Sequence, residues 1–161
     1  MTAKVLRADR PRVSPPSGEP AQDARPAITG GVMFRGRAAE KLPADLPRRP
    51  WQELTRCPHE DLADPRRIHV DCLGHVHLCQ GLSMGNFRQA PFADLVRAYQ
   101  GREHPIVGPL LDGGPAELVR RYELPHESSY VDECHLCFHA RRALICRFPQ
   151  YLAPPQVYGL D

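Results

Sequence analysis

The stretch Tyr130-Val-Asp-Glu-Cys-His-Leu-Cys-Phe-His-Ala-Arg-Arg-Ala-Leu144 holds two cysteines three residues apart, where an acidic turn runs into a helical pattern. At this spacing the sulfurs of Cys134 and Cys137 can face one ion or cluster, and the free amides of the first helical turn can point at them. Structural zinc and iron–sulfur sites usually have four ligands. The pair therefore predicts that two further ligands come from elsewhere in the chain.

The composition is that of an ordinary globular protein with many loops. The chain has 161 residues, of which 42% are hydrophobic and 25% charged, and this favours one domain with appendages. Its 18 prolines limit long regular elements. The net charge of +2, with acidic and basic residues interspersed, gives no reason to expect nucleic acid or an anionic membrane as a partner.

The cysteines indicate a reducing compartment. The sequence has six of them but neither a secretory signal nor an apolar run long enough to span a membrane. Such a pattern predicts cytoplasmic thiols, for which metal binding is more common than disulfide formation.

Four segments follow from composition and proline placement. Residues 1–30 are rich in Pro, Arg and Ala and predict a disordered tail. Residues 31–56 predict a connector with a short strand or helix and an anchoring Trp51. Residues 57–154 hold the cysteines and form the predicted domain, and residues 155–161 predict a loose C-terminal tail.

A β-hairpin is predicted where Arg67–Asp71 and His75–Cys79 both alternate apolar and polar residues. One face of the hairpin should be buried, with the side chains of Ile68, Val70, Val76 and Leu78. The other face then carries His75, His77 and Cys79, and for the two histidines the alternation favours a solvated face over metal ligation. After Cys79, residues 80–86 predict a glycine-punctuated loop.

Helical periodicity appears mainly after the hairpin. One or two helical turns are predicted over residues 35–42, and longer helices over 91–100, 105–111, 115–122 and 133–147. Gly113-Gly114 should separate the second and third of these longer helices. The predicted fold class is therefore α+β, with a small β-hairpin followed by several short helices around a site with cysteine ligands.

Four cysteines stand at element boundaries, where backbone amides are free to donate to sulfur. They are Cys57 in a turn, Cys79 at a strand end, and the pair Cys134 and Cys137 at a helix start. Cys72 lies in the hairpin turn, and Cys146 lies nine residues after Cys137, too far along one helix to share its ion. Neither of these two is predicted to be a ligand.

Several chemistries are compatible with these residues. Four thiolates suit an iron–sulfur cluster, and they also suit a structural zinc ion, for which His59, His135 or His139 could replace one cysteine. Buried free thiols and thiol redox catalysis at Cys134 are further alternatives. The last requires Cys134 to have a lowered pKa.

The arrangement resembles the auxiliary-cluster extension of radical S-adenosylmethionine (SAM) enzymes, called SPASM or, in its shortened form, twitch. The similar features are Cys57, a hairpin in which Gly74 precedes Cys79, and the later Cys134-His-Leu-Cys137. The stretch from Phe34-Arg-Gly-Arg37 to Pro154 is also similar to the C-terminal region of uncharacterised bacterial radical SAM proteins.

The resemblance implies one 4Fe–4S cluster on Cys57, Cys79, Cys134 and Cys137, in the shortened form of the domain. The Cys-x-x-x-Cys-x-x-Cys run of a radical SAM core does not occur in the sequence. The resemblance thus implies an accessory domain that does not cleave SAM itself. It would be a fragment, half of a split enzyme or a stand-alone module, with a radical SAM core protein as the expected partner. The alternative is a structural zinc module for protein–protein contact.

Overall fold

The computed structural model of the chain describes residues 31–160, so the tail predicted over residues 1–30 lies outside the described residues. The fold is α+β, as predicted, with small antiparallel sheets and several short helices. In chain order the elements are α1 (Arg37–Lys41), β1 (Arg49–Pro50), η1 (Trp51–Glu53), β2 (His69–Val70), β3 (His75–Cys79), β4 (Leu82–Asn86), α2 (Phe92–Ala98), α3 (Val107–Tyr122), β5 (Ser129–Tyr130), α4 (Glu133–Leu144) and η2 (Pro155–Tyr158).

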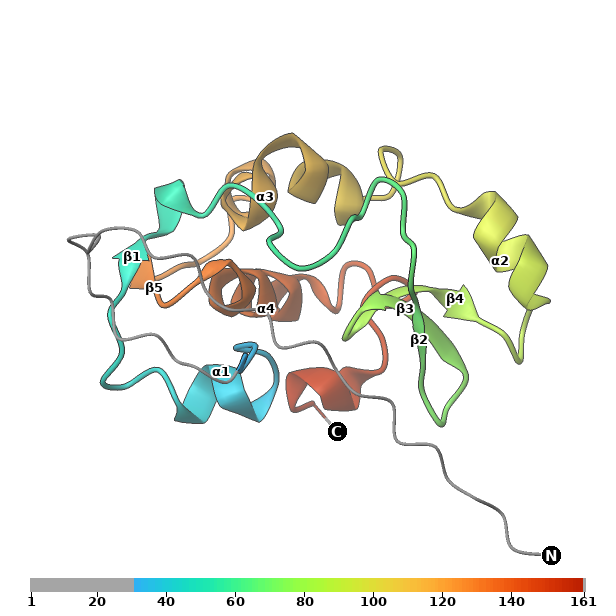
Figure 1. Ribbon diagram of the computed structural model, residues 1–161, viewed down its shortest axis with the longest axis horizontal. Helices are drawn as coiled ribbons and strands as arrows, with labels where there is room; N and C mark the ends of the chain where they lie inside the picture. The colour runs from blue at the N-terminus through green and yellow to red at the C-terminus, as the bar shows by residue number, and fades with distance from the viewer. Residues whose placement is uncertain (1–30, 161) are drawn as a thin grey trace, which may run out of the picture.

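Helix α4 lies at the centre of the molecule, with α3 above it and α1 and η2 below it in Figure 1. The three-stranded sheet β2-β3-β4 lies to one side, and the short pair β1-β5 lies at the other. The core packs between these parts around fully buried side chains such as Leu54, Leu118 and Leu136. The helix that carries the cysteine pair is therefore covered from both sides.

The sheet has one strand more than the sequence predicts. Strand β4 pairs with β3 in antiparallel fashion, although residues 80–86 read as a loop. Gly81, with φ 79°, makes the tight turn between the two strands, and the mixture of glycine and polar residues in β4 hides its strand character. Cys79 consequently lies at a hairpin turn between two strands and not at the start of a loop.

The burial of β3 differs from the predicted alternation. Val76, His77, Leu78 and Cys79 are all buried in a row, because register shifts interrupt the pairing with β4 at His77. His77 is only 4% exposed, so the expectation of a solvated histidine face is wrong for this residue. Val70, expected in the core, is 53% exposed.

The C-terminal segment is packed against the core, which corrects the loose tail predicted after residue 154. Tyr158 in η2 is 0% exposed, and its hydroxyl donates to the carbonyl oxygen of Gly81 at 2.8 Å. Its ring also stacks on Phe138 of α4 at 5.7 Å between centroids. The chain end thus fastens the β3–β4 turn to the central helix.

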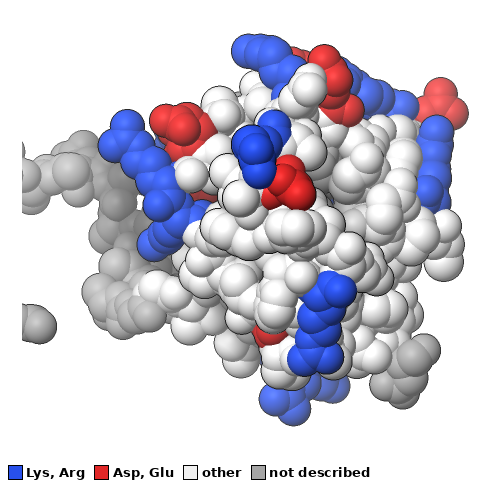
Figure 2. All heavy atoms as spheres, turned by 90° about the vertical axis from the view of Figure 1, so that its right-hand side faces the viewer, with Lys and Arg blue, Asp and Glu red and all other residues white. Residues whose placement is uncertain are grey.

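The surface on the side of the three-stranded sheet carries both acidic and basic side chains, and charge of one sign does not dominate it. Figure 2 shows basic and acidic side chains scattered over this face, with uncharged surface between them. Several apolar side chains are also exposed, among them Val70 in β2, Phe87 directly after β4, and Phe92 in α2. In the described part of the chain, no helix combines the length and the apolar character needed to cross a membrane.

Buried His104 predicts a loss of stability in acid. Its Nδ1 accepts hydrogen bonds from the amides of Ile106 and Val107 at 3.1 and 3.2 Å, and burial lowers its pKa to about 4. The unfolded chain, with a histidine pKa of about 6.5, therefore binds the proton more readily. This contribution to stability is complete above about pH 6.5 and is lost as the pH falls toward 4, by about 2 to 3 kcal/mol.

The variant His104→Asn tests this contribution, because an amide oxygen keeps an acceptor for the two amides and does not titrate in this range. Urea unfolding at about pH 7.5 and about pH 4.5 should show a smaller pH dependence in the variant than in the natural chain. Equal pH dependence in both proteins would exclude His104 as its source.

Candidate metal centre

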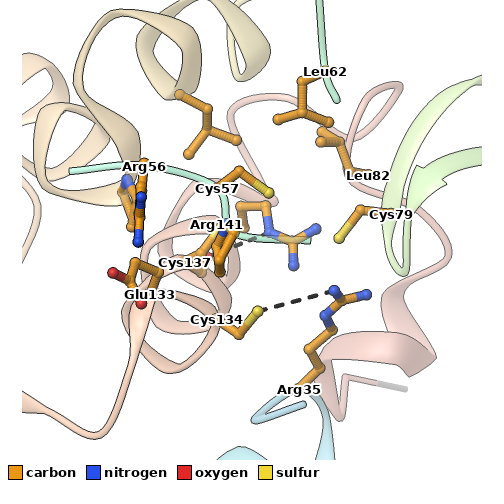
Figure 3. A pocket seen from close by; sticks show the side chains of 13 residues that line it. Arg35, Arg56, Cys57, Leu62, Cys79, Leu82, Glu133, Cys134, Cys137 and Arg141 are labelled. Atoms are coloured by element: carbon orange, nitrogen blue, oxygen red, sulfur yellow. Dashed lines mark hydrogen bonds between the residues drawn. The ribbon is translucent and has the colours of Figure 1, made fainter. Parts of the chain in front are cut away.

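The four cysteines predicted as ligands line one pocket. Cys57 comes from the segment after η1, Cys79 from the end of β3, and Cys134 and Cys137 from the start of α4. Figure 3 shows the sulfurs of Cys57, Cys79 and Cys134 turned toward a common space. Residues separated by up to 80 positions in the sequence are thus brought together at one place.

The two cysteines of α4 are placed by the start of the helix. Asp132 caps it, with its carboxylate accepting from the amide of His135 at 2.8 Å. Cys134 and Cys137 then follow within the first turns on the side that faces β3 and the Cys57 segment. The predicted start of this helix is confirmed, and the helix ends at Leu144, before the predicted residue 147.

Cys57 is placed by a close contact between its segment and the break in α3. Gly114 has φ 64° and ψ −160°, and a Cβ atom there would lie 2.2 Å from the carbonyl carbon of Thr55. Next to it, the amide of Ala116 donates to the carbonyl oxygen of Leu54 at 3.1 Å. The predicted break at Gly113-Gly114 is confirmed, and it also holds the backbone that carries Cys57.

The other cysteines, and the histidines considered as substitute ligands, lie outside the pocket. Cys72 and Cys146 are exposed and do not line the pocket. The histidines considered as substitutes, His59, His135 and His139, are not lining residues either. His135 is buried, and its Nδ1 accepts from the amide of Val131 at 3.2 Å, so this ring already has a structural role.

Arg141 introduces a buried positive charge beside the sulfurs. Its side chain is 1% exposed, and Figure 3 shows its guanidinium among the cysteines. It donates to the carbonyl oxygens of Gln80 at 3.0 Å and Cys137 at 3.3 Å. Burial disfavours its charged form, but the acidic groups around it, the hydroxyl of Tyr158 and the cysteine thiols, outweigh this effect and raise its pKa.

Arg35 approaches the same sulfurs from the segment before α1. Its Nη2 donates to Sγ of Cys134 at 3.9 Å. Burial on its own lowers its pKa, but the neighbouring thiols of Cys79 and Cys134 raise it more.

Neither guanidinium forms an ion pair with a carboxylate among residues 31–160. Glu133 also lines the pocket, but it pairs with Arg49 at 2.9 Å. Arginine stays charged in proteins, and a buried charge without a counter-charge costs several kcal/mol. Arg141, which is buried, therefore requires negative charge from the sulfurs or from what the sulfurs bind.

The thiols of the α4 pair are protonated in the metal-free chain. Burial raises the pKa of Cys134 to about 12, partly offset by Arg35, and raises that of Cys137 to about 11. A thiol oxidoreductase needs the opposite shift, so the structure contradicts that alternative for Cys134. A metal that binds here would have to displace these protons.

The pocket is narrow in this conformation. About 20 Å³ is open to the centre of a water-sized molecule, which is room for about one water. Among residues 31–160, no three His, Cys, Asp or Glu side chains stand as close as around a single bound metal ion. The thiols thus surround a common space but do not meet at one ion-binding position. A bound group larger than a water molecule requires the lining side chains to turn outward.

Sequence reasoning missed all three arginines that line the pocket, which are Arg35, Arg56 and Arg141. Arg35 lies in a short loop, and Arg141 lies in a helical run with Arg142, where the usual expectation is a solvated face. Only its position on the α4 face toward the cysteines distinguishes Arg141, and Arg142 instead pairs with Glu40 at the surface. No protein-family model, curated protein or solved structure matches the chain.

Proposed function

We propose that this chain binds a 4Fe–4S cluster through Cys57, Cys79, Cys134 and Cys137 and acts as an accessory module for a partner that carries the reaction. The cluster would hold together the segment after η1, the β3–β4 turn and α4. It would supply a one-electron redox centre or a ligand for a substrate. The chain itself supplies the thiolates, the buried surroundings and the guanidiniums of Arg35 and Arg141.

The observation that carries the proposal is the convergence of four cysteines from three separate segments on one pocket, beside the guanidinium groups of Arg35 and Arg141. Free buried cysteines are common, but they have no reason to collect around unpaired cations. A thiolate-ligated cluster carries net negative charge, because its four thiolates outweigh the charge of its iron–sulfur core. Arg35 and Arg141 supply the compensating positive charge.

The two candidate metals require different changes in the site. A zinc ion holds each sulfur at about 2.3 Å and so draws four thiolates into tight contact. A four-iron cluster is larger and keeps its ligands further apart. A zinc ion would require the thiols to move together, because no three possible ligands in residues 31–160 are grouped around one point, whereas a cluster would require the lining side chains to turn outward.

Anaerobic reconstitution tests the proposal directly. The chain is incubated with ferrous iron and sulfide, desalted, and analysed for iron, sulfide and zinc. We expect about four iron and four sulfide per chain and absorption near roughly 400 nm. Stoichiometric zinc in a colourless protein would support the structural zinc module instead, and the absence of both metals would overturn the proposal.

Arg141 should raise the reduction potential of the bound cluster. Reduction adds negative charge, which a nearby buried cation stabilises. In the variant Arg141→Met we expect a fall on the order of 100 mV, equivalent to a few kcal/mol for one electron. The potential is measured by a redox titration followed by electron paramagnetic resonance.

Arg142→Met is the matched control, because it removes the same charge from the next residue of α4, where the side chain is partly exposed and pairs with Glu40. Its effect should be much smaller because of solvent screening. Equal shifts in the two variants would show that Arg141 has no special influence on the cluster.

The proposed partner is a radical SAM core protein, or the upstream half of a split enzyme. We place this function in the cytoplasm, because the reducing environment there keeps both exposed thiols and cluster-binding thiols in the reduced state. Co-purification with a tagged radical SAM protein encoded beside this chain would test the partner.

A further inference from the structure

A second pocket lies beside α2, which packs on β4 at the sheet end of the molecule (Figure 1). Its volume is about 340 Å³, which is within the range of small-molecule sites. Its walls come from β4, α2, the segment that follows α2 and the loop before η2. Among the residues that the structure describes, none lines both this pocket and the cysteine pocket.

Three aromatic rings meet at this pocket, those of Tyr99, His104 and Tyr151. The centroid of the His104 ring lies 4.4 Å from that of Tyr151 and 6.4 Å from that of Tyr99. Both tyrosines are partly exposed, whereas His104 is buried against them. The face of an aromatic ring carries negative electrostatic potential, so the two tyrosines offer a surface that attracts a cation.

The three rings are uncharged near pH 7. Burial, with a smaller contribution from the charge of Asp61, raises the pKa of Tyr99 to about 12, and its hydroxyl donates to the carbonyl oxygen of Leu62 at 2.5 Å. Burial also lowers the pKa of His104 to about 4, so this imidazole is neutral. No positive charge on these rings therefore opposes the binding of a cation.

Glu103 is the one charged side chain among the described residues that line the pocket. It forms no ion pair with residues 31–160, and the neighbouring Arg102 instead pairs with Asp112 at 3.5 Å. With its amide nitrogen facing the carboxylate, Gln100 donates to the two oxygens of Glu103 at 2.8 and 2.9 Å. These hydrogen bonds hold the carboxylate in place and leave its negative charge uncompensated.

From these contacts we infer that the pocket beside α2 binds a small quaternary ammonium compound. Its methyl groups lie on the rings of Tyr99 and Tyr151, and the carboxylate of Glu103 balances its charge. Aromatic rings are the groups by which proteins recognise quaternary ammonium ions. A single carboxylate does not suffice for a divalent metal ion, which takes six or more oxygen ligands. The inference does not depend on the proposed function of the cysteine pocket.

The apolar part of the lining favours a quaternary over a primary ammonium ion. Met84, Leu95 and Ala98 line the pocket together with the rings. A primary ammonium ion has three N–H donors that need acceptors, whereas a quaternary ion has none and presents methyl groups instead. Methyl groups fit a wall of rings and apolar side chains without losing hydrogen bonds.

Calorimetric titration of the full chain with three matched compounds tests the inference. They are choline, dimethylbutanol, in which carbon replaces the nitrogen of choline, and ethanolamine, which has the charge without the methyl groups. We expect choline to bind about tenfold more tightly than either of the others. Equal affinity for dimethylbutanol, equal or higher affinity for ethanolamine, or no saturable binding of choline would each overturn the assignment.

Phosphatidylcholine vesicles separate a free ligand from a lipid head group of the same chemistry. The phosphate of the lipid would need a cation, and the charged residue that lines this pocket is Glu103. We therefore expect the chain to bind choline and to remain in the supernatant when the vesicles are sedimented. Sedimentation with the vesicles that choline reverses would overturn the assignment to a free compound.

The variant Glu103→Gln tests the role of the carboxylate, because it removes the charge and keeps the size of the side chain. Choline affinity should fall by about threefold, as expected for one partly solvated ion pair, and the difference should shrink at high salt. Glu53→Gln is the matched control, since Glu53 is an exposed carboxylate in η1 that does not line the pocket. Equal affinities in the two variants would refute the role of Glu103.

Two variants of Tyr151 test the role of the rings. Tyr151→Leu removes the ring and should weaken choline binding by about tenfold, whereas Tyr151→Phe keeps the ring and should weaken it much less. Dimethylbutanol, which has no charge, should bind nearly equally well to both variants. An equal loss of choline affinity in the two variants would show that the ring does not bind the cation.

A pocket-filling variant covers the case in which Tyr151→Leu does not fold. Ala98 lines the pocket and is exposed at the end of α2, so Ala98→Trp fills the space from outside the core. It should abolish choline binding with little change in thermal stability, and retained binding would overturn the proposed position. Iron and sulfide analysis of the same samples keeps the two proposals separate: choline binding without a cluster contradicts only the proposed function, and a cluster without choline binding contradicts only this inference.

Discussion

Cys137→Ser should abolish the bound cluster. Reconstituted under the same anaerobic conditions, the variant should retain less than about a tenth of the iron of the natural chain, because the site loses one of four thiolate ligands. Its thermal stability should fall to that of the metal-free protein, since the free energy of metal binding contributes to folding in small sites. Reduced solubility should accompany this loss.

Cys146→Ser and Cys72→Ser are the matched controls. Both side chains are exposed and neither lines the pocket, so iron content, absorption and stability should match those of the natural chain. The same iron content in Cys137→Ser and Cys146→Ser would refute the ligand assignment. Loss of iron in Cys72→Ser alone would indicate that Cys72 is a ligand and that the site lies at the hairpin turn.

Gly114→Ala should unfold the region around Cys57 and prevent cluster binding. The new Cβ atom would lie 2.2 Å from the carbonyl carbon of Thr55 and 2.3 Å from the amide nitrogen of Arg56. Both are backbone atoms, so no side-chain rotation relieves the clash. The φ of 64° with ψ of −160° is also a conformation that essentially only glycine adopts. We expect a loss of at least about 3 kcal/mol in urea unfolding.

The neighbouring glycine provides the control. A Cβ atom at Gly113 would approach only the side chain of Glu117, at 3.0 Å, and its φ of −168° is ordinary extended backbone. Gly113→Ala should therefore cost much less stability than Gly114→Ala and leave the iron content unchanged. If the two variants were equally stable, the contact between α3 and the Cys57 segment would not hold that cysteine in place.

Local patterns were sufficient for much of the fold. The acidic turn that runs into a helical pattern at Cys134 and Cys137 predicted the start of α4, and Gly113-Gly114 predicted the break in α3. Val76 and Leu78 were correctly assigned to the core. Each of these features depends on residues within a few positions of one another.

Features that depend on distant contacts could not be read in the same way. Strand β4 exists because β3 pairs with it. Tyr158 is buried because its hydroxyl donates to the carbonyl oxygen of Gly81 and its ring stacks on Phe138. His77 is buried because irregular pairing breaks the alternation of β3. In each case the local sequence favoured a different structure. Residues 80–86 suggested a loop in place of β4, the C-terminal segment suggested a loose tail in place of a buried Tyr158, and alternation in β3 suggested a solvated His77.

For the candidate site, the sequence alone determined which cysteines lie at element boundaries and which pair shares a helix turn, because helix geometry fixes the spacing of neighbours. Only the tertiary structure decided that Cys57 and Cys79 meet that pair, and that Arg35 and Arg141 stand among them without carboxylate partners in residues 31–160. The physical reason is that burial and charge pairing are properties of the packed chain: Arg141 and Arg142 are adjacent and chemically identical, and packing alone makes one a buried charge and the other a surface ion pair.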